Sequence, residues 1–307
     1  MIAFFANIFG FVLNFIYELI GNYGFAIILF SILIKLAMLP ITIKQQKTMK
    51  KSVKIQAKMK EIQFKYKNNP EKLNQETLEL YKTENMSPFS GCFSAIVQII
   101  LLFAVFYLVR SPLTYMKKVD ADVRDKYINI IHEYELSENS AYPEIDVIRE
   151  IDNIKNLRNN ENNEQTEERT GLAEIKDEEL EQLSINMEFF GLNLAQVPTK
   201  SSDWKAYIIP ILYVLVSVLS MKITNPTTTP KSEPEENKDE KSLAKTEDEF
   251  DAMAQMNKNM NMMFPVMYLA VALIAPLGLA LYWLMNSLLM IVERLALNKL
   301  LKDEEEN

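Results

Sequence analysis

The sequence contains only one cysteine, Cys92, and one histidine, His132, among its 307 residues. A disulfide within the chain is therefore excluded, and so few ligands argue against a zinc site of the usual type. The chain also lacks a phosphate-binding loop, a metal-ligand cluster and a nucleophile–histidine pair, so we predict no enzyme, no cofactor and no metal. Its first residues lack the basic region and cleavage box of a signal peptide and the Arg/Ser richness of a transit peptide.

Charged residues are scarce within a few long apolar blocks and crowded between them, although the whole chain carries a formal net charge of -8. About 20 helical residues cross a ~30 Å hydrocarbon layer, so blocks of this length predict membrane-spanning helices. The alternation expected of barrel strands is absent. The distribution predicts an all-α polytopic membrane protein with five core transmembrane helices, a cytoplasmic helical hairpin and an N-terminal interfacial helix.

The predicted boundaries divide the chain into ten segments. They are an amphipathic interfacial helix (1–20), a first span (21–43), a cytoplasmic helical hairpin (44–87), a second span (88–110), an extracytoplasmic acidic region (111–204), a third span (205–222), a cytoplasmic loop (223–258), a fourth span (259–276), a fifth span (277–297) and a cytoplasmic acidic tail (298–307).

The first apolar helix carries a single line of polar or small residues. Asn7, Gly10, Asn14 and Glu18 recur every three or four positions, which places them on one helix face. This pattern favours a helix that lies in the membrane interface. An ordinary first span or an uncleaved signal anchor is the alternative.

Segment 44–86 holds 11 lysines and 5 acidic residues. Apolar residues at helical spacing, followed by Asn69 as a helix N-cap and Pro70 in the first helical position, predict two antiparallel helices outside the membrane. Two independent surface helices are the alternative. The apolar block 260–297 is too long for one span, and the Pro and Gly of "APLG" (275–278) predict a tight turn between two short spans.

The lysine excess of segment 44–86 sets the predicted orientation, because basic loops remain in the cytoplasm. The region 111–204, with 21 acidic and 10 basic side chains, then lies outside. Five spans place the N-terminal helix outside and the C-terminal tail inside. We assign no function to 111–204, and we expect the stretch 159–168 and the loop 223–258 to be disordered.

The first span contains one charged residue, Lys35, within "FAIILFSILIKLAMLPITI" (25–43). A lysine at the centre of a span costs about 2.5–3.5 kcal/mol of insertion free energy. Snorkelling to the nearer, cytoplasmic surface would oppose the lean of helical side chains toward the N-terminus. Because intramembrane charges usually face a bundle interior or a wet cavity, we predict a water-filled groove around this ammonium group.

Other polar residues of the spans are candidates to line that groove. No aspartate or glutamate is expected inside a span to neutralise Lys35, since Glu293 is placed near the membrane edge, and hydration of the ammonium group is the predicted outcome. Hydrogen bonding between helices is the alternative role for the amides and serines. The candidate groove residues are Lys35, Ser31, Gln98, Tyr282, Trp283, Asn286 and Ser287.

Four stretches resemble the YidC/Oxa-type membrane protein insertase family. "GNYGFAIILFSILIKLAMLPITIKQQKTMKK" (21–51) resembles the first core span, and "YKNNPEKLNQETLELYKTENMSPFSGC" (66–92) the cytoplasmic hairpin with the entry to the second span. "FFGLNLAQVP" (189–198) resembles the lead-in to the third span, and "APLGLALYWLMNSLLMIVE" (275–293) the last turn and span. The resemblance implies five core helices around a hydrophilic groove that opens to the cytoplasm and to lipid and is closed on the outside.

The family places a positive residue, usually arginine, at the position of Lys35, and polar groove residues at those of Ser31, Gln98 and Trp283. Lysine keeps the charge but lacks the guanidinium fork for bidentate contacts. "SPFSGCFS" lacks the second glycine and the following proline often seen in the family. The acidic tail 298–307 also differs from the basic, ribosome-binding tail of some members.

The implied function is a membrane protein insertase that assists insertion and folding of membrane proteins from the cytoplasmic side, without nucleotide hydrolysis, in the bacterial plasma membrane. Its implied partners are nascent membrane-protein clients and the lipid bilayer. The Sec translocon, the signal recognition machinery and the ribosome are further candidates, and DNA is not. The basic hairpin would receive clients, targeting factors or ribosomal RNA, or would rest its charge on anionic lipid.

Two alternatives from other functional classes remain open. An anion-binding transporter or channel built around Lys35 predicts steady solute flux and usually an inverted repeat, which the sequence does not show. A membrane-anchored scaffold that acts through the basic hairpin predicts that Lys35 is dispensable.

Overall fold

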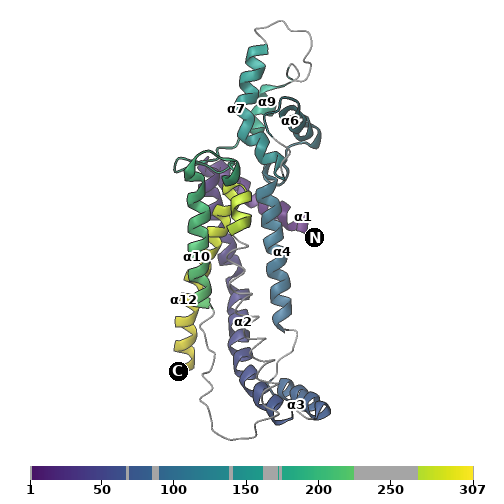
Figure 1. The fold of residues 1–307 in the computed structure, drawn as a ribbon, viewed down its shortest axis with the longest axis vertical. Helices are drawn as coiled ribbons and strands as arrows, with labels where there is room; N and C mark the ends of the chain where they lie inside the picture. Colours follow the sequence, from purple (N-terminus) through teal and green to yellow (C-terminus); the bar gives the residue numbers. More distant parts are fainter. Residues whose placement is uncertain are drawn as a thin grey trace.

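The computed structural model describes residues 2–66, 69–84, 90–137, 141–161, 172, 175–224 and 269–306. Its elements in chain order are α1 (Ile2–Ile20), α2 (Tyr23–Lys65), α3 (Pro70–Thr83), α4 (Ser90–Arg110), α5 (Pro112–Tyr115), α6 (Ala121–Glu133), α7 (Pro143–Glu161), α9 (Asp177–Leu183), β1 (Glu188–Phe189), β2 (Leu192–Asn193), the 3-10 helices η1 (Pro198–Lys200) and η2 (Trp204–Tyr207), α10 (Ile208–Thr224) and α12 (Leu277–Glu306). Figure 1 shows α2, α4, α10 and α12 running along the long axis, with α6, α7 and α9 at one end and α3 at the other. We call these the subdomain end and the hairpin end.

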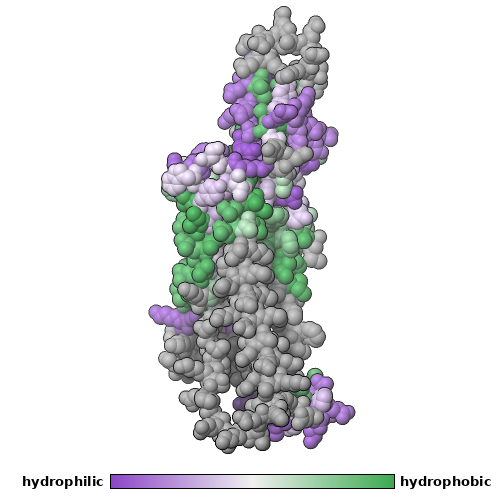
Figure 2. All heavy atoms as spheres, viewed as in Figure 1, coloured by the Kyte–Doolittle hydropathy of each residue, from purple (hydrophilic) through white to green (hydrophobic). Residues whose placement is uncertain are grey.

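The described helices include four that are long and apolar enough to cross a membrane, and these are Ile2–Ile20, Tyr23–Thr48, Trp204–Met221 and Leu277–Leu300. Figure 2 shows apolar side chains gathered next to the polar subdomain end. The predicted all-α polytopic class is confirmed. In α4 the described apolar stretch is the shorter Ile99–Arg110. Of the predicted fourth span, 259–276, only the residues from 269 onward are described, and 269–274 are helical.

Helix α2 is continuous over 43 residues, so the helix does not end at the predicted boundary between residues 43 and 44. Asn22 caps its N-terminus, because the Asn22 side-chain oxygen accepts a hydrogen bond from the Phe25 amide at 3.2 Å. Pro40 lies inside the helix and removes one backbone donor, yet the helix continues beyond it. At 1.5 Å per residue, α2 is about 65 Å long and extends well beyond a hydrocarbon layer of ~30 Å.

At the hairpin end, the distal half of α2 packs antiparallel against α3. The Tyr66 hydroxyl donates a hydrogen bond to Glu76 at 3.0 Å, and the Lys58 ammonium lies 2.6 Å from the Glu84 carboxylate. Residues later in α3 therefore contact residues earlier in α2. The predicted N-cap is confirmed, because the Asn69 side chain accepts a hydrogen bond from the first turn of α3.

Two residues of the polar line of α1 contact the segment after α4 at the subdomain end. The Glu18 carboxylate lies 2.6 Å from the Lys117 ammonium, and the Lys118 ammonium donates a hydrogen bond to the Asn7 side chain. Asn7 and Glu18 are about 16 Å apart along the helix, whereas their partners are consecutive residues. Helix α1 therefore lies alongside this connection, and Figure 1 shows it crossing the long axis.

A short β-hairpin holds the starts of α2 and α12 together at the subdomain end. Strands β1 and β2 pair antiparallel, and the Asn22 side chain donates a hydrogen bond to the carbonyl of Glu188 at 2.6 Å. Directly after β2, the carbonyl of Leu194 accepts a hydrogen bond from the amide of Gly278 at 2.9 Å. The predicted turn in "APLG" is confirmed, because the helical conformation stops at Ala275 and resumes at Leu277.

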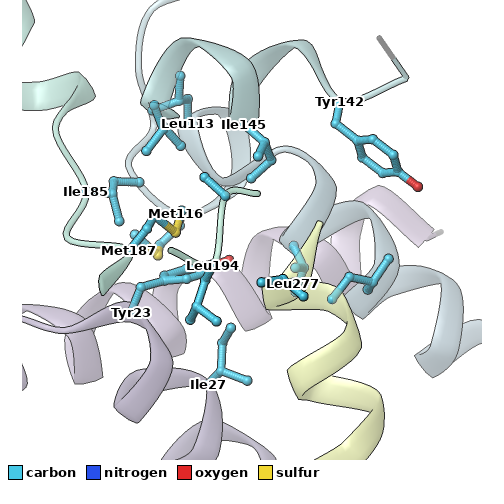
Figure 3. Packing of buried hydrophobic residues seen from close by; sticks show 14 of the residues in the cluster. Tyr23, Ile27, Leu113, Met116, Tyr142, Ile145, Ile185, Met187, Leu194 and Leu277 are labelled. Carbon is cyan, nitrogen blue, oxygen red and sulfur yellow. The ribbon is translucent and has the colours of Figure 1, made fainter. Parts of the chain in front are cut away.

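The core beside this β-hairpin joins elements that are far apart in the sequence. Figure 3 shows Tyr23 and Ile27 of α2 close to Leu194 and Leu277, with Met187 nearby. All five side chains are buried. Because their burial removes apolar surface from water on the subdomain side, it holds α2 and α12 next to each other at a fixed relative depth.

Part of the acidic region 111–204 forms a helical subdomain that the sequence did not predict. The Glu144 carboxylate of α7 accepts hydrogen bonds from the Thr114 amide at 3.0 Å and from the Thr114 hydroxyl at 2.5 Å, which links α7 to α5. Arg124 of α6 donates to the same hydroxyl at 2.8 Å. Residues 162–171 and 225–258, which hold most of the two segments expected to be disordered, lie outside the described residues.

We expect Gly10→Ala to loosen the contact of α1 with the segment after α4. A Cβ at Gly10 would overlap the carbonyl oxygen of Tyr115, and a backbone atom cannot rotate away as a side chain can. Overpacking of this kind costs about 1–3 kcal/mol, which exceeds the helix-propensity gain of alanine over glycine. The measurement is thermal unfolding of the detergent-solubilised chain, and the expected result is a lower midpoint.

Gly278→Ala is the matched control for Gly10→Ala. A Cβ at Gly278 would meet Tyr23 at 3.4 Å and the Leu194 carbonyl at 3.6 Å, which is ordinary van der Waals contact. This variant should unfold at the wild-type temperature or above it. Equal midpoints for the two alanine variants would contradict the close approach of α1.

Burial raises the pKa of the Glu144 carboxyl above its ordinary value of 4.5, and the hydrogen bonds from Thr114 partly oppose the rise. The folded state then binds the proton more tightly than the unfolded state does. As pH rises from about 4.5 through the raised folded-state pKa, the wild type should lose stability relative to Glu144→Gln. The measurement is the difference in unfolding temperature between the two proteins across this range.

The control for Glu144→Gln is Asp152→Asn, which removes an exposed carboxylate from the same helix. A stability difference between wild type and Glu144→Gln that stays constant with pH would contradict the buried state of Glu144.

Candidate functional site

Polar side chains of α2 follow one face of the helix. Ser31, Lys35, Thr42 and Gln46 are separated by four, seven and four residues, so they project in nearly the same direction. Two of them, Ser31 and Gln46, are buried. Lys35 is the only charged residue between Tyr23 and Ile43 in the sequence. The face therefore presents one cation within a row of uncharged polar groups.

Helix α12 supplies the opposite side of the site. Asn286 and Glu293 are seven residues apart and lie near one face of the helix. Glu293 is the only acidic residue in the last apolar block, 260–297. Because the start of α12 is held beside the start of α2, this face can meet the polar face of α2 at a defined depth.

Lys35 and Glu293 form an ion pair between α2 and α12. The Lys35 Nζ lies 3.2 Å from the Glu293 Oε2, and the two side chains are 20% and 10% exposed. Lys35 is 12 residues beyond Tyr23, and Glu293 is 15 residues beyond Gly278. Along their helices they therefore lie about 18 and 22 Å from the contacts that hold the starts of α2 and α12 together. Their long side chains span the remaining difference in depth.

This pair corrects one expectation. We predicted that no carboxylate would neutralise Lys35 and that Glu293 would lie only near the membrane edge; the structure places Glu293 in contact with Lys35. The physical reason is that two opposite charges of low exposure are less costly together than either would be alone. The sequence carries a signal for the pairing, because the only acidic residue of block 260–297 lies seven residues after Asn286.

A second polar contact joins the same two helices closer to the hairpin end. The Gln46 side-chain amide donates a hydrogen bond to the Asn298 side-chain oxygen at 3.1 Å. Gln46 is only 5% exposed. Neither residue was among the predicted site residues, since both lie beyond the predicted ends of their spans. The helices α2 and α12 are thus linked by an ion pair and an amide pair along one seam.

The remaining predicted residues fall into three groups. Ser31, Tyr282 and Ser287 are buried, and the Ser31 hydroxyl donates to the Ile27 carbonyl of its own helix at 2.7 Å. Trp283 and Asn286 are half-buried, and the Trp283 ring lies 5.9 Å from the ring of Tyr213 on α10. Gln98 belongs to α4, and its side chain lies outside the described part of the structure. The described contacts therefore bring together Lys35 and Glu293 only.

A cleft of about 620 Å³ lies at the subdomain end, away from the Lys35–Glu293 pair. It is lined by residues of the helical subdomain and of the loop before α10, among them Arg149, Glu150, Gln196 and Lys200. It includes no predicted groove residue. Arg149 is engaged by Asp146 at 2.9 Å and by Glu150 at 2.9 Å, so its charge is matched within the subdomain.

The site can bind charge but offers little for covalent chemistry. An ammonium group at low exposure attracts carboxylates and phosphates strongly, because water screens the interaction less than at the surface. The described polar contact of Lys35 is the Glu293 carboxylate. This arrangement suits the reversible recognition of an acidic group.

Parts of the chain are similar to known proteins. The family model described as "60Kd inner membrane protein" matches residues 15–305. A membrane protein insertase YidC of Prosthecochloris aestuarii is 48% identical over 96 residues, which cover 31% of this chain and 16% of that protein. The proteins of the same name from Fusobacterium nucleatum and Caldanaerobacter subterraneus are 43% and 40% identical over 101 and 102 residues, covering 33% of this chain in each case. The matched stretches cover 49% and 50% of those two relatives, so the chain spans no more than about half the length of the curated relatives it matches.

We expect the Lys35–Glu293 pair to show energetic coupling. Lys35→Met leaves a carboxylate of low exposure without its cation, whereas Lys35→Met combined with Glu293→Gln removes both charges. The single variant should therefore unfold at a lower temperature than the double variant. A double-mutant cycle on the detergent-solubilised chain should give a coupling free energy of about 0.5–3 kcal/mol.

The exposed pair of Lys155 and Asp152, at 3.2 Å, is the matched control for that cycle. Its coupling should be no more than about 1 kcal/mol because solvent screens it. Strictly additive effects of the Lys35 and Glu293 substitutions would show that the two charges do not interact.

Proposed function

The chain belongs to the 60Kd inner membrane protein family, also called the YidC/Oxa1 family, and on this premise we propose that it is a membrane protein insertase. The observation that carries the proposal is the family match over residues 15–305, together with curated relatives that bear the name membrane protein insertase. The described fold is compatible with it, since it is a helical membrane protein with a polar contact deep between its helices. We place the protein in the bacterial inner membrane as a multi-pass protein.

The orientation we propose has the hairpin end in the cytoplasm. The basic segment 44–86 lies at this end, and the positive-inside rule favours its cytoplasmic location. The helical subdomain then lies outside, and α12 ends in the cytoplasm. Helix α1 lies in the outer interface, which its lateral contacts with Lys117 and Lys118 support.

The mechanism we propose is electrostatic and needs no nucleotide hydrolysis. A short acidic or polar segment of a client enters a hydrophilic groove from the cytoplasmic side and approaches Lys35. Ser31, Gln98 and Asn286 replace part of the hydration of that segment, while Tyr282, Trp283 and Ser287 complete the lining. The groove thereby shortens the low-dielectric distance that the segment must cross.

The apolar helix of the client supplies the driving force for insertion. It slides along the second and fourth spans into lipid, and the burial of its hydrocarbon surface makes the step favourable. Helix α4 supports this path, because Ile99, Leu102 and Phe103 are all about half exposed on its surface. These side chains offer the client an apolar surface that is continuous with the lipid.

The hairpin of α2 and α3 is the proposed receiving surface. It carries the lysine excess of segment 44–86 and two strongly exposed apolar side chains, Phe64 and Leu78. Nascent clients are the first candidates to bind it, followed by targeting factors and ribosomal RNA. Contact with anionic lipid is the simpler role for the same charges.

The test is insertion of a single-span client with an acidic N-terminal tail into vesicles that hold the full chain. Lys35→Arg should keep activity because it keeps the positive charge. Lys35→Ala should slow insertion of an acidic tail about tenfold or more, since a hydrogen bond to a charged group contributes about 1.5–3 kcal/mol. Lys35→Glu should reduce insertion to the level of empty vesicles, because two carboxylates would then face each other.

Protease protection of the client tail measures insertion, and size-exclusion profiles check that each variant is folded. Insertion by all four proteins at the level of empty vesicles would favour a scaffold over an insertase, and equal insertion above that level would show that Lys35 is dispensable. Steady anion flux through vesicles that insert no client would favour a transporter or channel.

A further inference from the structure

The ion pair gives the site a resident carboxylate that competes with any incoming one. Glu293 contacts Lys35 at 3.2 Å, and its side chain is nine-tenths buried. We propose that Glu293 is a specificity-determining residue: an acidic client segment must displace it from Lys35, so that Glu293 sets the minimum negative charge a segment needs. This inference rests on the proposed insertase function and names the class of segment that the site prefers.

The pair is incompletely satisfied on the carboxylate side. Oε2 of Glu293 contacts Lys35, whereas Oε1 is buried and makes no hydrogen bond with any described residue. A buried carboxylate oxygen without a donor costs stability, because it has lost its water without replacement. The resident carboxylate is therefore held less firmly than a fully bonded one, which makes its displacement easier.

The ammonium side also has unused capacity. A lysine ammonium has three N–H donors, and Lys35 uses one of them on Glu293 within the described part of the chain. Its side chain is 20% exposed, twice the value for Glu293. A second carboxylate can thus approach Lys35 while Glu293 is still bound. Exchange of partners then needs no intermediate in which Lys35 has lost every carboxylate.

The charge balance explains why exchange selects for acidic segments. The resident pair has a net charge of zero, so the site exerts a weaker long-range attraction than an isolated cation would. A segment with one carboxylate replaces the Lys35–Glu293 contact with an equivalent contact, so its binding gains little free energy. A segment with two or more carboxylates can displace Glu293 and keep a further acidic group near the ammonium.

A purely structural role for the pair makes a different prediction. If Glu293 serves only to hold α2 against α12, its loss should impair every client equally, whatever the charge of the client tail. The contact of Gln46 with Asn298 on the same seam provides a second link between these helices. Loss of the Glu293 charge alone therefore leaves the helices connected.

The first experiment uses the full chain in vesicles and clients whose tails carry no, one, two or three aspartates. Wild type should insert clients with two or three aspartates well and a client with one poorly. Glu293→Gln should raise insertion of the one-aspartate client about fivefold or more. It should have little effect on insertion of the three-aspartate client. Glu293→Asp keeps the charge and should restore the wild-type preference.

Glu18→Gln is the matched control, because it removes a carboxylate from an ion pair with Lys117 at 2.6 Å at the subdomain end. It should leave the dependence on tail charge unchanged. The inference would be overturned if insertion by Glu293→Gln depended on tail charge as insertion by wild type does. It would also be overturned if Glu293→Gln lost insertion activity equally for all tails.

A second measurement separates this inference from the proposed function. A short fluorescent peptide with a single carboxylate is titrated onto the purified full chain in detergent, and anisotropy reports its binding. Glu293→Gln should bind the peptide about fivefold more tightly than wild type does. Adding Lys35→Met to Glu293→Gln should abolish this gain in affinity. Equal or weaker binding to Glu293→Gln, or no binding to either protein, rejects the role of Glu293. Absence of client insertion by wild type would reject the insertase proposal alone.

Discussion

The structure depends on keeping two opposite charges of low exposure, Lys35 and Glu293, in contact between two helices. Lys35 and Glu293 come from helices that are far apart in the sequence, and each would be costly alone. Their contact pairs the Lys35 ammonium with a carboxylate of another helix, and we propose that an acidic client segment displaces this carboxylate. In the proposed exchange of partners, the selectivity of the site depends on how well the Glu293 carboxylate is bonded. The unpaired Glu293 oxygen limits that bonding within the described chain.

The position of the pair follows from how the subdomain end is built. Asn22, the short β-hairpin and the buried cluster around Tyr23 hold the starts of α2 and α12 at one level. From there the helices α2 and α12 carry Lys35 and Glu293 to similar depths. Helix α2 then continues beyond any membrane thickness into the basic hairpin. A single continuous helix therefore connects the contacts at the subdomain end, Lys35 and the proposed receiving surface for clients.

Patterns of neighbouring residues in the sequence predicted the features that depend on interactions between neighbouring residues. The Asn69 cap, the turn at Pro276 and the all-α membrane class follow from residues close in the sequence, and the structure confirms them. The partner of Lys35 could not be derived in this way, because it lies 258 residues away and only tertiary packing brings it near. The polar line on α1 was correctly placed on one face, yet its partners after α4 were not evident from its periodicity. The helical subdomain was missed because its acidic composition resembles that of a disordered region.

The most direct test of this account is an experimental structure of the full chain in a lipid bilayer that resolves the side chains of residues 35 and 293. We expect Lys35 Nζ to lie within about 4 Å of a Glu293 carboxylate oxygen while no client is bound. A Lys35 ammonium surrounded by hydrocarbon, or extended among lipid phosphates with Glu293 pointing elsewhere, would contradict it.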